Sequence, residues 1–336
     1  MSSTESAKVG AAPAAAGGPA VSVIMPAYQC APYIGEALDS VFAQTFDEDY
    51  EVIVVNDGSP DTEELERVLD EYRGRVVYLK QENRGVSAAR NAAIRAARAP
   101  LLGMLDADDV WEPDYLDAQV AAMRADPSLG AVYPNTLIFG DVPQAGRTFM
   151  DVNPSEGEVT FEALVTQRCT VGNSVMVRRA AVVEAGWFDE AISRSEDFDL
   201  WLRILSKGWR IAYNRRVLSR YRRHAGGLSA DPVLMCRDIL RVLDKAGRTP
   251  GLGEDDRRVL VREHARFHAM LRLQEGKRAF MRGDARAALE GLGEANRYFR
   301  SRKLALAMLL LKVAPGLLLR AYDLRDRYVL KTSTRF

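Results

Sequence analysis

The sequence predicts an α/β fold, in which a mainly parallel sheet is flanked by helices and followed by a C-terminal helical extension. Short β-branched apolar runs alternate with amphipathic segments of helical length over the first 111 residues. One of these runs, residues 101–105, is apolar throughout, which is typical of a strand covered by helices on both faces. Polar and acidic residues follow the runs directly, at the place where such sheets bind their ligands.

The elements before residue 111 repeat one strand–helix unit. The expected strands are 21–26, 51–55, 76–80 and 101–105, and the expected helices are 33–44, 65–72 and 86–98. Such repetition predicts right-handed crossovers and parallel strands, so that the carboxyl ends of the first, second and fourth strands share one rim. We therefore expect Tyr28, Asp57 and the acidic residues 106–109 to face a common crevice.

Beyond Trp111 the pattern loosens into a mixed α/β arrangement. A helix is expected from Pro113 and another from the acidic segment 195–199, with strands at 130–139, 171–178, 209–213 and 217–221. Helices are expected at 233–246, 254–275, 277–282 and 285–299. We therefore expect a main domain over residues 21–230 and a helical C-terminal region over 231–336, after an Ala/Gly/Pro-rich leader, 1–20, that is disordered.

Composition narrows the class of protein and its compartment. A chain of 336 residues with 47% hydrophobic content can bury a large core. The three cysteines, Cys30, Cys169 and Cys236, lie far apart, which indicates neither a zinc site nor a disulfide framework. The leader contains no apolar segment typical of a signal peptide. These features favour a reducing, cytoplasmic location.

The C-terminal region is the basic part of a chain whose net charge is zero. Residues 231–336 contain 23 Lys and Arg against 13 Asp and Glu. Within it, the run 304–319 is almost wholly apolar, has basic flanks, and is shorter than the ~20 residues that a membrane span needs. Two interpretations stay open: this run lies on the cytoplasmic face of the cell membrane, or it packs on the main domain.

The acidic group after the fourth strand indicates a metal. Carboxylates at the edge of a dry core repel one another unless a cation neutralises them, and hard oxygen ligands suit Mg²⁺ or Mn²⁺. The alternative is an Asp-rich turn that caps the helix opened by Pro113, because Asp is a favoured N-cap residue.

Five segments taken together resemble the family 2 inverting glycosyltransferases. They are VSVIMPAYQ, VIVVNDGSPD, NRGVSAARN, LDADD and SEDFDLWLR, in this order and within about residues 20–230. The resemblance implies the GT-A fold, a Rossmann-like nucleotide-diphospho-sugar transferase domain, and therefore a catalytic role for residues 21–230.

The resemblance also implies roles for residues at the predicted rim. Asp57 would recognise the nucleobase, and the wall of the base site would be Pro26, Ala27 and Tyr28. Arg84 and Arg90 flank a helix start that could meet phosphate, although solvated arginines on a helix surface would fit equally well.

Metal and base residues follow in the same way. The Asp-x-Asp motif corresponds to Asp106 and Asp108, of which Asp108 is the expected direct metal ligand, and His224 occupies the place of a second ligand found in some members. Asp197 corresponds to the general base, with the alternative that it is only the N-cap of the helix bearing Leu200.

The implied reaction is transfer of one sugar, a hexosyl or N-acetylhexosaminyl unit, from a nucleoside-diphosphate sugar to a hydroxyl. The expected acceptor is a glycan or a lipid-linked molecule of the cell envelope, with no nucleic-acid partner. The chain has 199–203 (DLWLR) in place of the Gln-x-x-Arg-Trp signature of processive synthases, which favours single transfer. Asn56 replaces an Asp found in many members, and a uridine diphosphate donor remains the first expectation.

Three other function classes are compatible with part of this sequence. A phosphatase of the haloacid-dehalogenase type carries Asp-x-Asp after its first strand, whereas here the motif follows the fourth. A sugar-nucleotide pyrophosphorylase would share the fold, but no Gly-rich basic phosphate loop follows the first strand. A non-catalytic protein that binds a nucleotide sugar and recruits a partner through its helical region stays open.

Overall fold

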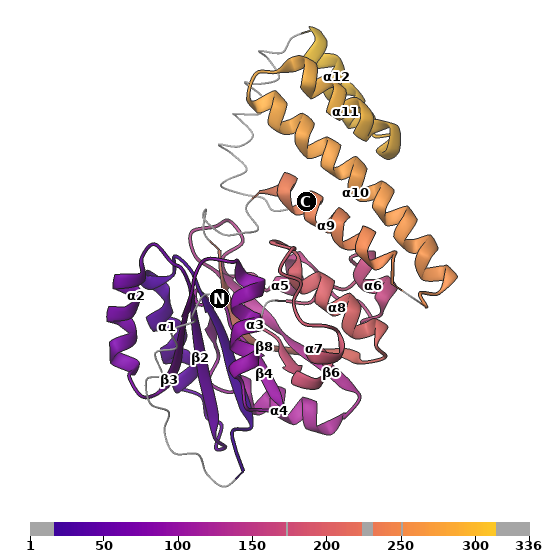
Figure 1. Ribbon diagram of the computed structural model, residues 1–336. Coiled ribbons are helices and arrows are strands. Elements are labelled where there is room, and N and C mark those ends of the chain that lie inside the picture. Colours follow the sequence, from indigo (N-terminus) through magenta and orange to yellow (C-terminus); the bar gives the residue numbers. More distant parts are fainter. Residues whose placement is uncertain (1–16, 173, 224–230, 250, 314–336) are drawn as a thin grey trace, which may run out of the picture. The chain divides into compact units, whose positions relative to one another are not determined.

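The computed structural model describes residues 17–172, 174–223, 231–249 and 251–313. The chain divides into two compact units (Figure 1). The first comprises Met1–Gly140 and Ala145–Arg223, and the second comprises Asp141–Gln144 and His224–Phe336. The predicted α/β class and the helical C-terminal extension are confirmed.

The first unit is built on a sheet whose described part has the strand order β3-β2-β1-β4-β7-β6-β8-β5. The strands are β1 (Val21–Ala27), β2 (Tyr50–Asp57), β3 (Val76–Gln81), β4 (Leu101–Met104), β5 (Val110–Trp111), β6 (Leu129–Phe139), β7 (Met176–Arg178) and β8 (Arg210–Arg222). The first four strands in the sheet order are parallel, β7 is antiparallel to both neighbours, and β5 is antiparallel to β8. The sheet is therefore mainly parallel on the side of β1 and mixed beyond β4.

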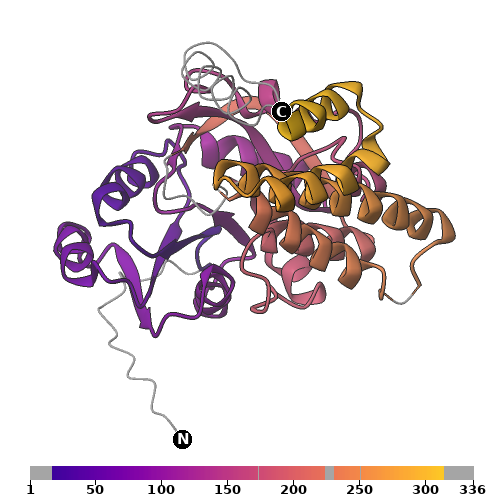
Figure 2. The ribbon, with the colours of Figure 1, turned by 90° about the horizontal axis from the view of Figure 1, so that it is seen from above.

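Helices connect the strands of this unit. They are α1 (Ala31–Phe42), α2 (Thr62–Leu69), α3 (Val86–Ala96), α4 (Tyr115–Ala125), α5 (Phe149–Val152), α6 (Phe161–Val165), α7 (Arg179–Glu184) and α8 (Glu196–Ser206), with a 3₁₀ turn at Asp70–Tyr72. Seen from above, α1 and α3 lie on opposite faces of the sheet (Figure 2).

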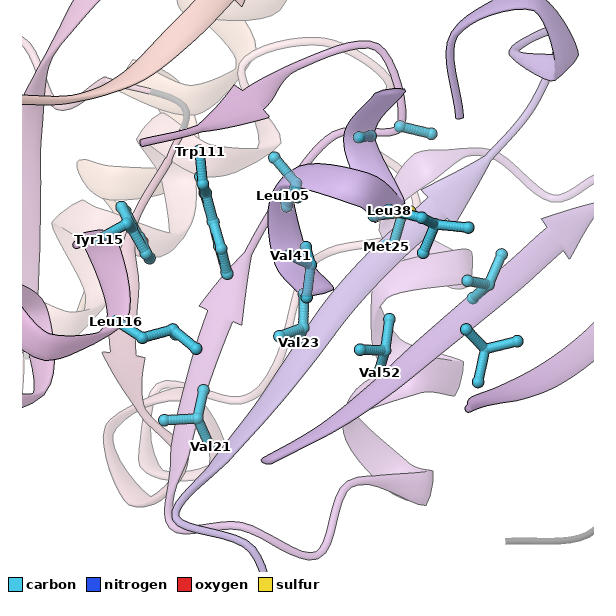
Figure 3. Packing of buried hydrophobic residues seen from close by; sticks show 14 of the residues in the cluster. Val21, Val23, Met25, Leu38, Val41, Val52, Leu105, Trp111, Tyr115 and Leu116 are labelled. Atoms are coloured by element: carbon cyan, nitrogen blue, oxygen red, sulfur yellow. The ribbon is translucent and has the colours of Figure 1, made fainter. Parts of the chain in front are cut away.

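Alternation along β1 explains how the sheet is covered on both faces. Val21, Val23 and Met25 point to one face and pack with Leu38 and Val41 of α1 (Figure 3). The intervening Ile24 is equally buried and points to the other face, where α3 packs against β1 and β2. Strands buried on both faces explain the unbroken apolar runs in the sequence.

Two strand predictions are wrong in their extent. The expected strand 171–178 is reduced to Met176–Arg178, with residue 173 outside the described part of the chain. The expected strands 209–213 and 217–221 are one strand, β8, whose exposed residues 215–217 made the middle look like a turn. β6 pairs with β8 along this length, and its register shifts at Pro134–Thr136, opposite the exposed residues of β8.

The second unit consists of helices in its described part: α9 (Pro232–Ala246), α10 (Glu254–Met281), α11 (Ala285–Phe299) and α12 (Arg302–Val313). The predicted break between 275 and 277 is wrong, because α10 continues through Gly276. A Cβ on Gly276 would lie 2.8 Å from the Leu292 amide nitrogen, and Gly291 of α11 lies against Gly276. This glycine permits two helices to approach closely and does not end one.

The last described helix, α12, carries part of the apolar run 304–319. α12 packs Leu304, Met308 and Leu311 on α10 and α11, so part of the apolar run packs within the second unit itself. Among the residues that the structure describes, there is no helix of the length and apolarity required to cross a bilayer.

Candidate active site

The acidic turn after β4 lies at the carboxyl end of the parallel strands, as predicted. Asp106 and Asp108 are half-buried, whereas Asp109 is buried and accepts a hydrogen bond of 2.8 Å from the backbone nitrogen of Arg222. Burial, together with the negative charges of Asp108 and Asp106, raises the pKa of Asp109 well above its ordinary value. The carboxylates therefore differ in role: Asp109 is part of the core edge, and Asp106 and Asp108 reach the rim.

Arg222 fixes this turn, although sequence reasoning did not single it out. Its Nε donates to the backbone oxygen of Asp108 at 2.9 Å, and its guanidinium forms an ion pair with Glu36. The same guanidinium lies over the rings of Tyr33 and Phe139. β8 thus holds the acidic turn from the mixed part of the sheet. Basic residues at the end of the last core strand were the available signal.

Asp57 ends β2 and holds the loop that leads into α3. Its Oδ1 accepts from Gln81 Nε2 at 2.7 Å and from the Arg84 backbone nitrogen at 2.9 Å, and its Oδ2 accepts from the Gly85 backbone nitrogen at 2.8 Å. A carboxylate has about four lone-pair sites, so Oδ2 retains acceptor capacity for a ligand. Asp57 therefore combines a structural role with the predicted one.

Asn56 is completely buried and acts within the protein. Its Nδ2 donates to Thr62 Oγ1 and to the Tyr78 hydroxyl, both at 2.9 Å, and its Oδ1 accepts from the Ser59 backbone nitrogen. A carboxylate could not donate those two bonds. The Asn in place of Asp is thus explained by its neighbours.

The end of β1 presents one aromatic side chain. Pro26 is half-buried and Ala27 is buried, whereas Tyr28 is 48% exposed. Gln29 follows with φ 51° and donates its backbone N–H to Ser59 Oγ at 2.7 Å. The chain therefore turns sharply after Ala27 and leaves the Tyr28 ring accessible at the same rim as Asp57.

Arg90 of α3 contacts two acidic clusters: the turn after β4, with Asp106 and Asp108, and the start of α8, with Glu196 and Asp197. Its Nη2 donates to Asp106 Oδ1 at 2.7 Å and its Nη1 donates to Glu196 Oε1 at 2.5 Å, and its side chain is 11% exposed. Burial would lower the pKa of Arg90, but the charges of Asp106 and Glu196 outweigh it and raise the pKa above its ordinary value. The alternative of a solvated arginine on the helix surface is therefore wrong for Arg90.

Glu196 is the residue that sequence reasoning passed over beside Asp197. Burial raises its pKa to about 7, against the opposing effect of Arg90. The signal was present in the Glu-Asp pair, but only the packed structure shows which carboxylate meets the arginine.

Asp197 lies in the first turn of α8 and is half-buried. The N-cap of this helix is Ser195, so the alternative of Asp197 as the N-cap is wrong. Its Oδ1 accepts from the Phe198 backbone nitrogen at 2.7 Å, and burial raises its pKa above the ordinary value. A carboxylate of raised pKa is a better proton acceptor for a hydroxyl.

Arg84 behaves differently from Arg90. Its side chain is 62% exposed and its Nη2 donates to Glu190 Oε2 at 2.6 Å. A surface pair of this kind contributes little to stability, so a ligand phosphate could compete for the guanidinium.

The carboxylates of the acidic turn fit a divalent metal whose coordination shell is completed by substrate. No cluster of three or more carboxylate, histidine or cysteine ligands occurs among the described residues. Mg²⁺ is commonly held by one or two carboxylates together with substrate phosphates and water, and Asp108 at the rim can supply one. His224 lies outside the described residues.

Residues 22–184 match the model of the family described as glycosyl transferase family 2. The chain carries a family 2 glycosyltransferase domain. Four of the five segments that carried the resemblance lie within this match, apart from Val21 at the start of the first, whereas the segment that contains Asp197 lies outside it.

Curated relatives are about 30% identical to this chain over the aligned residues. An uncharacterized glycosyltransferase of Rickettsia felis is 30% identical over 62% of this chain and 35% of its own length. A chondroitin synthase of Escherichia coli is 31% identical over 59% of this chain and 29% of its own length. The chain thus spans about a third of the length of these relatives.

Solved structures share the fold of the glycosyltransferase domain at low sequence identity. S. aureus TarS 1–349 in complex with UDP-GlcNAc has a TM-score of 0.56 at 16% identity and covers 92% of this chain and 91% of its own. The mannosyltransferase PcManGT of Pyrobaculum calidifontis in complex with GDP-Man and Mn²⁺ has a TM-score of 0.59 at 21% identity, covering 92% and 87%. The GT-A fold is thereby confirmed.

Proposed function

We propose that the protein transfers one sugar from a nucleoside-diphosphate sugar to an acceptor hydroxyl, with inversion at the anomeric carbon. The observation that carries the proposal is the position of the two acidic clusters: Arg90 contacts Asp106 of the donor-side turn and Glu196, the neighbour of Asp197. A donor bound at the first cluster would therefore present its sugar close to the second.

The donor side is assigned to the rim formed by β1, β2 and β4. Asp57 would accept from the base, and the exposed Tyr28 ring, after Pro26 and Ala27, would lie against it. Uridine diphosphate is the first candidate nucleotide, since TarS binds UDP-GlcNAc, and guanosine diphosphate is the second, since PcManGT binds GDP-Man.

Asp108 would hold Mg²⁺ or Mn²⁺, with His224 as the second candidate ligand. The bound ion would stabilise the negative charge that develops on the leaving diphosphate. Asp106 is paired with Arg90, and Asp108 is half-buried at the same turn, where a substrate diphosphate would complete the coordination of the ion.

Asp197 would accept the proton of the acceptor hydroxyl as that oxygen attacks the anomeric carbon. A single carboxylate suffices because no covalent intermediate forms, in contrast to the two-carboxylate retaining scheme of hydrolases. The acceptor class proposed is a glycan or lipid-linked molecule in assembly of a polysaccharide or glycolipid of the cell envelope. The chondroitin synthase relative supports a glycan acceptor.

We expect the full chain, incubated with Mn²⁺ and a panel of radiolabelled UDP- and GDP-sugars, to hydrolyse one donor slowly. Water can replace the acceptor when the donor is bound next to a base, so hydrolysis identifies the donor without knowledge of the acceptor. The matched control is the same panel in the presence of a chelator. Tight binding without hydrolysis of any donor would instead support a non-catalytic nucleotide-sugar-binding protein.

The second unit suggests that the protein works at a membrane surface. α12 leaves Leu306, Leu309, Leu310 and Val313 exposed, whereas its Leu304, Met308 and Leu311 are packed. Residues 297–336 contain ten Lys and Arg against two acidic residues. Exposed apolar side chains with basic flanks are typical of a helix that lies in an anionic lipid interface, where each cation adds about 1 kcal/mol.

We expect the protein to float with anionic liposomes at low salt and to lose part of this binding at high salt, because salt screens the charges. The double variant Leu309→Asp/Val313→Asp should stay at the bottom of the gradient. Val261→Asp is the matched control, because Val261 is 73% exposed on α10, away from the proposed lipid-facing helix. Equal flotation of both variants would remove α12 from any membrane contact.

A further inference from the structure

The NRGVSAARN segment has a regularity that the proposed donor and metal sites leave unexplained. Arg90 and Asn91 follow Ser87 on α3 by three and four residues, so both lie next to Ser87 on the helix surface. Each of the three side chains bonds to the segment 187–196, about a hundred residues further along the chain. These side chains of α3 therefore form hydrogen bonds with the segment that precedes α8 and with its first residue.

Asn91 binds that segment in the way a neighbouring strand would. Its Nδ2 donates to the Phe188 backbone oxygen at 2.9 Å, and its Oδ1 accepts from the Phe188 backbone nitrogen at 3.0 Å. Ser87 Oγ donates to the Ile192 backbone oxygen at 3.2 Å. Asn91 and Ser87 are both buried, so these bonds replace water that the segment would otherwise require.

Arg90 extends the contact in two directions. It bonds to Glu196 at the start of α8 and to Asp106 in the acidic turn, and its guanidinium lies 5.4 Å from the centre of the Phe188 ring. A planar guanidinium can donate from two nitrogens to two carboxylates at fixed angles, which a lysine ammonium cannot reproduce. The acidic turn and the start of α8 are therefore linked through one rigid group.

We propose that Arg90 is a positioning residue, which sets the distance between the donor-side acidic turn and the start of the helix that carries Asp197, and that Ser87 and Asn91 hold the intervening segment. The proposal rests on the proposed function for its catalytic meaning. It assigns Arg90 a role that differs from phosphate binding, since both of its outer nitrogens donate to protein carboxylates.

The electrostatic consequence follows from the groups around the start of α8. Glu196 and Asp197 are faced by Arg90 from α3 and by Asp106 from the acidic turn, and Asp199 on the same helix is paired with Arg203. Arg90 lowers the pKa of Glu196 and of Asp197, against their burial. Loss of the cation therefore raises both pKa values and makes protonation of the base easier.

The test compares Arg90→Lys and Arg90→Gln with the matched control Arg73→Lys. Arg73 is 69% exposed and pairs with Asp70 at the end of α2, not with the segment 187–196. Arg90→Lys is expected to lower kcat by about 100-fold, the effect of a displacement of about 1 Å between reacting groups, with Kd for UDP or GDP and Mn²⁺ little changed. Arg90→Gln should also move the acid limb of the kcat/KM profile to higher pH, because the base is active when deprotonated.

Hydrogen exchange supplies a readout that does not depend on activity. Backbone amides of residues 187–197 should exchange faster in both Arg90 variants and at the wild-type rate in Arg73→Lys. Arg90→Gln leaves two carboxylates unpaired and can prevent folding. Glu196→Gln weakens the same contact with Arg90 without leaving an unpaired carboxylate at residue 196. In the double variant Arg90→Lys/Glu196→Gln, the fold-loss of kcat should be smaller than the product of the two single losses, because both changes break the same contact.

The outcomes separate the inference from the proposed function. Loss of nucleotide affinity with unchanged kcat, or unchanged exchange of residues 187–197, would overturn the positioning role. A wild-type protein that hydrolyses no donor would refute the proposed function, while the exchange data would still decide whether Arg90 holds the segment.

Discussion

Replacement of Asp197 by Asn is expected to lower the rate of transfer by about 10²–10⁴-fold, the usual contribution of general-base catalysis. The amide keeps the size of the side chain, and its oxygen can still accept from the Phe198 backbone nitrogen. It cannot take the proton of the acceptor hydroxyl. Donor affinity should therefore change little, and kcat measured at saturating donor is the quantity that reports the loss.

The control for this prediction is Asp70→Asn, which alters an exposed carboxylate that pairs with Arg73 on the surface. It should leave both kcat and donor affinity at the wild-type level. If Asp197→Asn abolishes donor binding together with transfer, Asp197 holds the site together and its assignment as the base is wrong.

Replacement of Asp108 by Ala is expected to weaken Mn²⁺-dependent binding of a nucleoside diphosphate by at least about 100-fold, since a coordinated ion contributes several kcal/mol. The backbone of the turn should persist, because Arg222 bonds to the Asp108 backbone oxygen and to Asp109, not to the Asp108 carboxylate. Isothermal titration calorimetry with UDP and with GDP, in Mn²⁺ and in chelator, measures the effect.

Asp49→Ala removes an exposed carboxylate ahead of β2 and serves as the matched control. It should bind the nucleotide as the wild type does, with the same requirement for Mn²⁺. Undiminished affinity of Asp108→Ala in the presence of Mn²⁺ would exclude Asp108 from the metal site, and thermal unfolding of both variants shows whether the fold persists.

The sequence by itself determined the α/β class and the rim at which the acidic residues gather. Alternating strand and helix periodicity implies parallel strands, and parallel strands place their carboxyl ends at one edge. The positions of Asp57 and Asp106 at that edge therefore follow from local patterns alone. Residue types and order were also sufficient to indicate the family, which the match to residues 22–184 confirmed.

Only the tertiary structure decided which side chains meet across the fold. Arg90 and Glu196 are more than a hundred residues apart, and their contact depends on how α3 and α8 pack, which no local period encodes. The same reason explains Gly276, which a sequence pattern marks as a break but which lies where α11 approaches α10. Side-chain partners and close approaches are properties of packing, because they depend on atoms that the chain brings together only when it folds.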